Sequence, residues 1–386
     1  MAPIAVDPPV AAPVISKKKW TPVAAIKEIT NTGPDGYNKD IEEGGDNPAS
    51  YPKYLPRWSK GVSLPPLEPF EYVERGKFAD PSFPNLLKEG VTVDDITPIM
   101  GAEVRGVQLS QLNDAGKDEL ALLVAQKRVL AFRDQDFAEL PLQSAVDYVA
   151  YYGRLHVHPS SPTPTGFPQI HLIHRSQGDK TAGVLFKGRN NSVSWHSDVT
   201  YEKQPPGITF LYVLDCPPVG GDTLYIDAAA AYRRLSPAFQ KRLHGLKAVH
   251  SGFEQAANAK SSGGESRRAP ISTIHPLVRT HPATGEKILF YNPQFVRQIV
   301  GMKKEESDYL LNFLNMHMAL SQDIQCRPRW RPGTVVVWDN RVTSHTAIVD
   351  WTTGDRRHLA RITPQAEIPY ETPWRLEEGD EDEDLE

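Results

Sequence analysis

The feature that most constrains the fold is a series of short runs rich in β-branched and aromatic residues. They read ITFLYVL, DTLYIDA, KILFYN, GTVVVWDN and HLARIT, and they begin at residues 208, 222, 287, 333 and 358. Turns rich in proline and glycine separate these runs, and helical patterns interrupt them without alternating with them regularly. This pattern favours a mainly β fold with flanking helices, a β-sandwich or jelly roll, over a repeated βαβ fold.

The preceding part of the chain predicts the start of the same domain. Residues 96–110 alternate like two strands around two glycines, and residues 129–135, VLAFRDQ, read as a buried strand. Between them, Asn113 is a suitable cap for a helix with an apolar stripe. We expect further helices after Ser236-Pro237 and over residues 304–318, where leucines share one face.

Composition divides the chain into three parts. Residues 1–60 are rich in Pro, Gly, Asn and Asp, which predicts an extended, partly disordered N-terminal arm. Residues 61–375 are expected to form a single domain, in which residues 254–270 read as a mobile loop. Residues 376–386 form an acidic segment that we expect to be disordered and solvated.

Charge, hydropathy and cysteine content limit the classes of partner and the cellular location that we expect. Eight of the last ten residues are acidic, so the net charge of −5 conceals a mildly basic body without Lys/Arg-rich runs. We therefore expect no nucleic-acid partner. No apolar run approaches the roughly 20 residues that cross a bilayer, so no membrane association is expected. The two cysteines and the absence of a secretory signal favour a cytoplasmic setting. A homo-oligomer is compatible with the sequence.

The segment SVSWHSDVTY contains the pair of residues that suggests a metal site. If it is a strand, His196 and Asp198 project from one face. An imidazole and a carboxylate on one face form two corners of a 2-His-1-carboxylate site, which suits non-haem Fe(II). A distant histidine should supply the third corner, and His345 follows an apolar strand. Alone, the triplet is weak evidence for a metal, and an exposed or hydrogen-bonded histidine is the simpler interpretation.

A longer set of motifs makes the pattern specific. Residues 195–225, WHSDVTYEKQPPGITFLYVLDCPPVGGDTLY, are followed by GTVVVWDNRVTSH at 333–345 and DRRHLARIT at 355–363. Together with GAEVRGVQLS and YYGRLHVHP, this arrangement resembles the taurine/2,4-D dioxygenase family, including fungal alkylsulfonate and taurine dioxygenases. The similarity extends from about residue 93 to about residue 370. These enzymes depend on Fe(II) and 2-oxoglutarate and use O2.

The resemblance implies a double-stranded β-helix, the jelly roll of clavaminate-synthase-like enzymes. It implies that His196, Asp198 and His345 bind iron, and that Arg357 and Thr223 bind the distal carboxylate of 2-oxoglutarate. The chemistry is consistent, because a guanidinium meets a carboxylate with two parallel hydrogen bonds. Arg356 is a rival for this role, but strand pleating sends neighbouring side chains opposite ways.

The resemblance also implies an anionic substrate. His158 and Arg361 match the positions that grip the sulfonate in taurine-type enzymes. The positions of the tyrosine and asparagine that complete a taurine pocket fall near Ser161 and Ser192, which predicts a substrate other than taurine. An alkyl sulfonate fits, since hydroxylation next to sulfur releases sulfite and an aldehyde. An organic sulfate ester or an aryloxyacetate-type carboxylate also suits an anion clamp.

Other interpretations remain open at this level. Trp338 is expected to form a wall of the iron pocket, although a core position explains it almost as well. His171 and seven further histidines lack a partner at ligand spacing and read as structural or exposed. A non-catalytic β-helix binding protein should have lost a ligand or Arg357. A metal hydrolase gives no reason for Arg357 and Thr223 and needs a general base, which is not evident.

Overall fold

The computed structural model describes residues 48–58, 61–178, 186–187, 190, 193–261 and 264–375. The acidic segment and most of the predicted arm lie outside these residues. The boundaries of the three predicted parts therefore stay a prediction.

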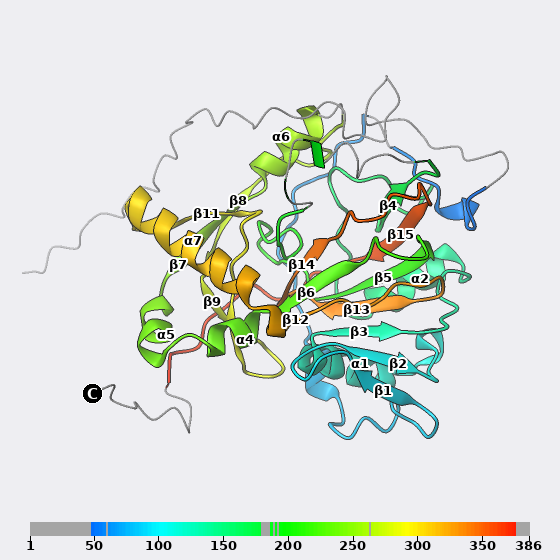
Figure 1. Ribbon diagram of the computed structural model, residues 1–386, viewed down its shortest axis with the longest axis horizontal. Helices are drawn as coiled ribbons and strands as arrows, with labels where there is room; N and C mark the ends of the chain where they lie inside the picture. The colour runs from blue at the N-terminus through cyan, green and yellow to red at the C-terminus, as the bar shows by residue number, and fades with distance from the viewer. Residues whose placement is uncertain are drawn as a thin grey trace, which may run out of the picture.

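A seven-stranded sheet occupies the right-hand part of the molecule in Figure 1. All neighbouring strands pair antiparallel except β2 and β3, which run parallel. β3, β13 and β15 are buried along their whole length, and β5 is buried except at its last residue. Burial explains the near-continuous apolar runs of β3, β5 and β13, whereas β15 also carries two arginines and a histidine. The strand order is β1 (Thr92–Asp95), β2 (Ala102–Arg105), β3 (Val129–Phe132), β13 (Val335–Asp339), β5 (Ile208–Asp215), β15 (Arg357–Ile362) and β4 (Ile170–Arg175).

Two helices cover one face of this sheet. α1 (Asp114–Lys127) and α2 (Leu142–Ala150) pack with sheet residues such as Phe132 and Phe210 in one apolar cluster. The Asn113 side chain accepts a hydrogen bond from the backbone N–H of Gly116, which confirms the predicted cap of α1.

A smaller sheet lies against the other face. It consists of β12 (Gln325–Cys326), β6 (Thr223–Asp227) and β14 (Thr343–Ala347), in that order. Tyr225 of this sheet packs with Leu211, Trp338 and Leu359 of the large sheet. Two facing sheets with a shared core make the predicted jelly roll, and the space between them is where a site can form.

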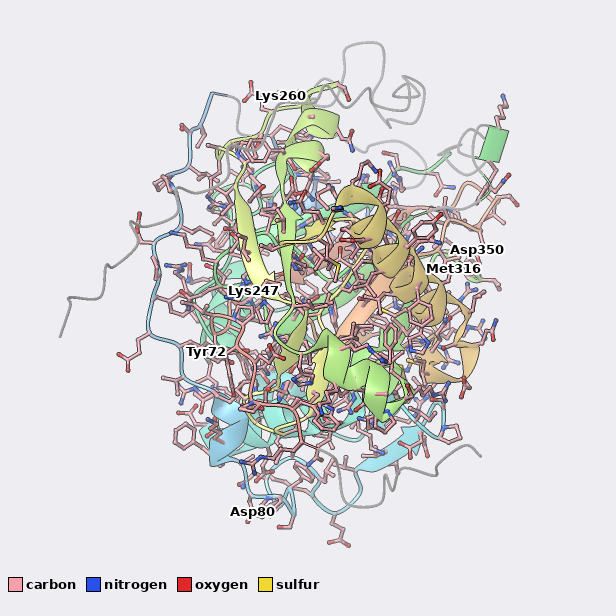
Figure 2. The ribbon with its side chains drawn as sticks, turned by 90° about the vertical axis from the view of Figure 1, so that its left-hand side faces the viewer. Tyr72, Asp80, Lys247, Lys260, Met316 and Asp350 are labelled. Atoms are coloured by element: carbon pink, nitrogen blue, oxygen red, sulfur yellow. The ribbon has the colours of Figure 1, made fainter. Side chains whose placement is uncertain are left out.

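A third region flanks the small sheet, on the left of Figure 1. Its apolar cluster joins helices to short strands, and α7 covers its outer side, with Met316 half-exposed on that helix (Figure 2). Its elements are α4 (Ala228–Arg233), α5 (Pro237–Leu243), β7 (Lys247–Ser251), α6 (Phe253–Ser261), β8 (Ser272–Pro276), β9 (Val278–Thr280), β10 (Lys287–Leu289), β11 (Val296–Ile299) and α7 (Lys304–Leu320). Short 3₁₀ helices elsewhere in the chain are η1 (Pro52–Tyr54), η2 (Arg75–Phe78), η3 (Leu109–Gln111) and η4 (Gln322–Ile324).

The other two predicted helices are also confirmed, whereas the loop prediction was wrong in part. α5 begins after Ser236, whose side chain accepts from the N–H of Phe239, and α7 covers the predicted range. The prediction of a mobile loop from residue 254 was wrong over its first part, because α6 occupies it. Ala256 and Ala259 bury one side of α6, so tertiary packing stabilises a helix that composition alone does not favour. None of the described helices is both long enough and apolar enough to span a bilayer.

Candidate functional site

A cavity of about 370 Å³ opens between the two sheets. The large sheet contributes side chains from β4, β5, β13 and β15, and the small sheet contributes side chains from β6 and β14. Gln255 and Asn258 of α6 also line it. Residues far apart in the sequence therefore share one enclosed space, as a binding site requires.

Three potential metal ligands meet in this cavity. One ligand atom from each of His196, Asp198 and His345 lies within 4.8 Å of the others. Nε2 of His196 lies 4.0 Å from Oδ1 of Asp198, and Nε2 of His345 lies 3.9 Å from the same oxygen. The sequence predicted this grouping, and the structure brings the three side chains together.

The local backbone differs from the prediction. Only His196 pairs with the small sheet: its N–H donates to the carbonyl of His345 at 3.0 Å, and the N–H of His345 donates back at 2.7 Å. Asp198 lies in a turn, next to Val199 with a φ of 37°. The expected strand through Asp198 was therefore wrong. A turn held by the His196–His345 bridge, rather than strand pleating, directs the carboxylate towards the imidazoles.

The protonation states of this cluster suit a divalent metal. Burial lowers the pKa of His196 and lowers that of His345 to about 3, so both imidazoles are neutral at pH 7. Nδ1 of His196 donates to the carbonyl of Ser194 at 2.9 Å, which leaves the Nε2 lone pair free. Burial opposes ionisation of Asp198, but Arg361, His345 and His196 together outweigh it and hold the pKa of that carboxyl well below its usual range. Two neutral imidazoles and a carboxylate fit Fe(II).

Arg357 is a buried cation that forms no ion pair with a carboxylate of the described residues. Its side chain lines the cavity with 5% of its surface exposed, and its guanidinium lies over the rings of Trp330 and Trp351 at 4.9 and 5.7 Å. Nε donates to the carbonyl of Gly221 at 2.8 Å, but no carboxylate of the described residues forms an ion pair with it. Burying an uncompensated charge is costly, so this geometry points to an anionic ligand.

The surroundings of Arg357 agree with the predicted strand alternation. The adjacent Arg356 points away from the cavity and donates to the carbonyl of Pro48 at 3.1 Å. Thr223 opens β6 and lines the same cavity as Arg357. Gly221 has a φ of +71°, and a Cβ there would lie 3.3 Å from Cδ of Arg357, so a larger residue would crowd the guanidinium.

A second polar group occupies the wall formed by β4 and β15. Nη1 of Arg361 donates to both oxygens of Asp198, at 2.8 and 2.9 Å, and Nη2 donates to Nδ1 of His171 at 3.0 Å. The His158 ring lies 4.7 Å from that of His171, and burial lowers the pKa of both imidazoles well below 6.5. The prediction that His171 is merely structural or exposed was wrong, because it lines the cavity beside Arg361.

The remaining predicted site residues are Ser161, Trp338 and Ser192. Ser161 lines the cavity, with its hydroxyl 2.8 Å from Nδ1 of His158. Trp338 is a buried wall residue, 5.3 Å from the ring of His345. Ser192 lies outside the described residues. Sequence analysis missed Tyr225 and Trp330 as lining residues, since only the pairing of distant strands reveals them.

Comparisons with known proteins agree with this geometry. Residues 92–363 match the family model of the taurine catabolism dioxygenase TauD, TfdA family. An alpha-ketoglutarate-dependent sulfonate dioxygenase of Saccharomyces cerevisiae is 45% identical over 327 residues, covering 84% of this chain and 79% of the relative. An alpha-ketoglutarate-dependent sulfate ester dioxygenase of Pseudomonas putida is 31% identical, covering 73% of this chain and 93% of the relative.

A solved structure supports the same assignment. The crystal structure of a taurine dioxygenase from Burkholderia xenovorans is similar, with a TM-score of 0.59 and 30% identity over 72% of this chain and 92% of that chain. The family model covers most of the chain and includes all three residues of the His–Asp–His cluster. The chain therefore belongs to the TauD/TfdA dioxygenase family.

Proposed function

We propose that this protein is an Fe(II)- and 2-oxoglutarate-dependent dioxygenase that hydroxylates an alkyl sulfonate. One observation carries the proposal. The buried guanidinium of Arg357, which pairs with no carboxylate of the described residues, faces the same cavity as the His–Asp–His cluster. A dicarboxylate that reaches the metal with one end would place its other carboxylate against Arg357. The cluster would hold Fe(II), which supplies the activation of O2 for oxidative decarboxylation of 2-oxoglutarate and hydroxylation of the substrate.

The protein's own residues orient the reactants. Arg357 would bind the distal carboxylate of 2-oxoglutarate, and the Thr223 hydroxyl would hold the rotation of that carboxylate. The rings of Tyr225 and Trp338 would exclude water around His345, from which they lie 5.8 and 5.3 Å. A dry, preorganised cavity strengthens these electrostatic contacts.

The charge of the cavity supports a singly charged substrate. Among the described lining residues, the charged side chains are Asp198, Arg357 and Arg361. With Fe(II) and doubly charged 2-oxoglutarate added, one positive charge remains, which matches a monoanion. Nε of Arg361 is buried and lacks a hydrogen-bond partner among the described residues, so a donor is available for an anionic head group.

Sulfonate is the head group that we favour. Hydroxylation of the carbon bonded to sulfur gives an α-hydroxysulfonate, which breaks its C–S bond to yield sulfite and an aldehyde. The name of the Saccharomyces cerevisiae relative supports this substrate class. A sulfate ester is the second candidate, since it carries the same single charge and the Pseudomonas putida relative is named for that activity. The cytoplasmic location and the absence of a nucleic-acid partner stay predictions.

A substrate screen tests the proposal. Iron-loaded protein is incubated with 2-oxoglutarate, O2 and panels of alkyl sulfonates, sulfate esters and aryloxyacetates. Succinate measures turnover in every panel, while sulfite, sulfate and phenol report the three substrate classes. We expect sulfite from the sulfonates, with loss of turnover in Arg361→Gln and retention in Arg356→Gln, whose side chain lies outside the cavity.

Two results would count against the proposal. Turnover of sulfate esters or carboxylates alone would replace the sulfonate assignment. Absence of succinate in all panels, with folded and iron-loaded protein, would favour the non-catalytic binding protein.

A further inference from the structure

We infer that His171 is a positioning residue of the substrate site, which holds the guanidinium of Arg361 so that its free Nε–H faces the substrate anion. The inference rests on the proposed function and adds a residue that the family motifs did not point to. It starts from strand register: β4 and β15 pair antiparallel with His171 directly opposite Arg361. Both side chains line the cavity.

The direction of the hydrogen bond defines the state of His171. A guanidinium can only donate, so Nδ1 of His171 must accept from Nη2 of Arg361 at 3.0 Å. The ring is partly buried, and desolvation lowers its pKa well below 6.5, so it is neutral and its proton resides on Nε2. The same reasoning applies to His158, whose Nδ1 accepts from the backbone N–H of Ser160 at 3.3 Å. Two neutral Nε2–H imidazoles thus stand side by side in one wall.

The guanidinium of Arg361 is held at both of its ends. Nη1 is anchored on Asp198 and Nη2 on His171, while Nε has no partner among the described residues. Without an acceptor at residue 171, Nη2 would lose its hydrogen bond and Asp198 would be the remaining acceptor for the whole fork. The arginine would then turn towards the carboxylate and away from the substrate. His171 therefore keeps Nη1 of Arg361 on the proposed iron ligand Asp198 and leaves Nε directed towards the anion.

Isosteric variants separate this role from simple packing. In His171→Asn the side-chain oxygen takes the place of Nδ1, and in His171→Gln the amide reaches the place of Nε2 instead. His171→Leu removes the acceptor entirely. A matched control is His174→Leu on the same strand, since His174 packs against His358 at 4.7 Å and does not line the cavity.

The experiment measures binding and turnover separately. Calorimetry gives the Kd of butanesulfonate for the anaerobic protein loaded with Fe(II) and 2-oxoglutarate, and sulfite release gives KM and kcat. We expect Kd and KM to rise roughly tenfold or more in His171→Leu and His171→Gln, as for loss of a hydrogen bond to a charged group. The kcat should change less, His171→Asn should restore most of the affinity, and His174→Leu should keep the wild-type KM.

The outcomes distinguish this inference from the proposed function. If wild-type protein turns over sulfonates but His171→Gln and His171→Leu bind butanesulfonate as tightly as wild type, the positioning role is wrong. The same conclusion follows if His171→Asn is as defective as His171→Gln, because the acceptor would then be irrelevant. If the wild-type protein neither binds nor oxidises any sulfonate, the proposed function fails and the inference fails with it.

Discussion

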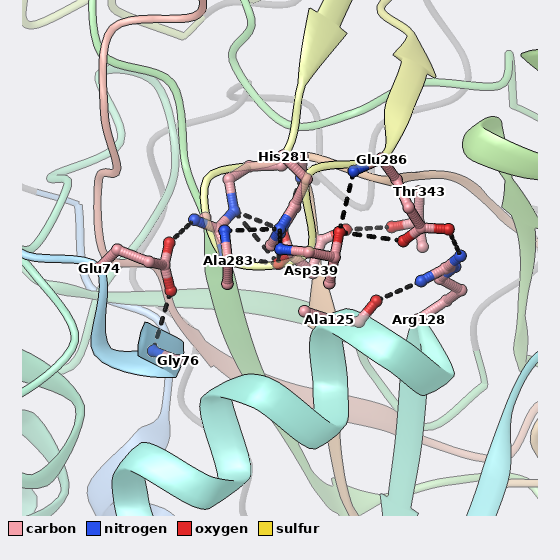
Figure 3. A network of polar contacts seen from close by, with 12 residues as sticks. Glu74, Gly76, Ala125, Arg128, His281, Ala283, Glu286, Asp339 and Thr343 are labelled. Atoms are coloured by element: carbon pink, nitrogen blue, oxygen red, sulfur yellow. Dashed lines mark hydrogen bonds and ion pairs between the residues drawn. The ribbon is translucent and has the colours of Figure 1, made fainter. Parts of the chain in front are cut away.

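Two groups of buried arginines in this molecule differ in how their charges are compensated. Arg128 and Arg341 belong to a network of ion pairs between β13, β6 and the third region, which we call the paired network (Figure 3). Arg357 and Arg361 line the cavity: Arg361 pairs with the single carboxylate of Asp198, whereas Arg357 forms no ion pair with a carboxylate of the described residues. All four residues have less than a tenth of their surface exposed. Similar burial therefore serves two different purposes.

The paired network is neutralised within the protein. Arg341 donates to Asp339 at 2.6 to 3.1 Å and also pairs with Glu74 and Glu367. Arg128 pairs with Asp227 at 3.0 Å and Glu286 at 2.6 Å. Oδ2 of Asp339 also contacts Nε2 of His281 at 2.9 Å. Each cation faces at least two carboxylates, as a structural network requires.

The pKa values of Arg341 and Arg357 shift in opposite directions. Burial alone would lower the pKa of Arg341, but Asp339 and Glu74 outweigh it and raise the pKa well above its ordinary value. For Arg357 burial prevails and, together with the nearby Arg175, outweighs the attraction of Asp222, which lowers the pKa to about 10. A cation that the fold compensates stabilises the fold, whereas an uncompensated one is kept at a cost and marks a ligand site.

The largest effect should come from breaking the paired network. Arg341→Met leaves two buried carboxylates and the partly buried Glu367 without their shared cation, so we expect the free energy of unfolding to fall by about 3–5 kcal/mol. Urea unfolding followed by tryptophan fluorescence measures this loss. Unchanged stability would mean that the network is not a structural element.

The matched substitution in the cavity should not lower stability. Arg357→Met removes an uncompensated charge, so we expect stability equal to or above that of the wild type. The Kd of 2-oxoglutarate should rise on the order of 100-fold, since its distal carboxylate loses a buried charged partner. Isothermal titration of the Fe(II) protein without O2 measures the Kd. Normal affinity together with lost stability would place Arg357 among the structural arginines.

Acid should weaken the fold in two stages. Burial lowers the pKa of His275 and His358 to about 4, whereas unfolded histidine titrates near 6.5. The unfolded chain then binds more protons between these values, so stability is full above about pH 6.5 and falls as pH drops towards 4. Asp339 and Glu367 of the paired network have lowered pKa values and add their loss only below about pH 4.

Thermal unfolding at a series of pH values separates the stages. His275→Gln keeps an amide near the carbonyl of Glu202, which Nε2 of His275 contacts at 2.9 Å. This variant should show a flatter decline between pH 6.5 and 4 than the wild type. An identical decline in both proteins would show that His275 takes no part in the first stage.

The smallest effect concerns the charge of the substrate. With one net positive charge available, the cavity should bind butanesulfonate about tenfold or more tightly than the doubly charged butylphosphonate at pH 8.5, a difference of about 1.4 kcal/mol. Competition against sulfite release measures both affinities. Equal affinity would indicate a further compensating cation.

The sequence predicted what depends on local pattern. Alternation along β15 separated Arg356 from Arg357, and the cap at Asn113 located the start of α1. What depends on pairing between distant strands escaped it. His171 lies opposite Arg361, 190 residues away in sequence, so only the register of β4 and β15 reveals the contact. The turn at Asp198 escaped for a similar reason, since the backbone of His345 holds it in place.

The central claim is that Arg357 and the His–Asp–His cluster form one site for 2-oxoglutarate and Fe(II). Anaerobic addition of both to the protein, followed by visible absorption, tests it most directly. We expect a weak charge-transfer band in the wild type, a much weaker one in Arg357→Met and none in His345→Ala, while Arg356→Gln retains it. Intact, iron-loaded wild-type protein that shows no band with saturating 2-oxoglutarate would contradict the claim.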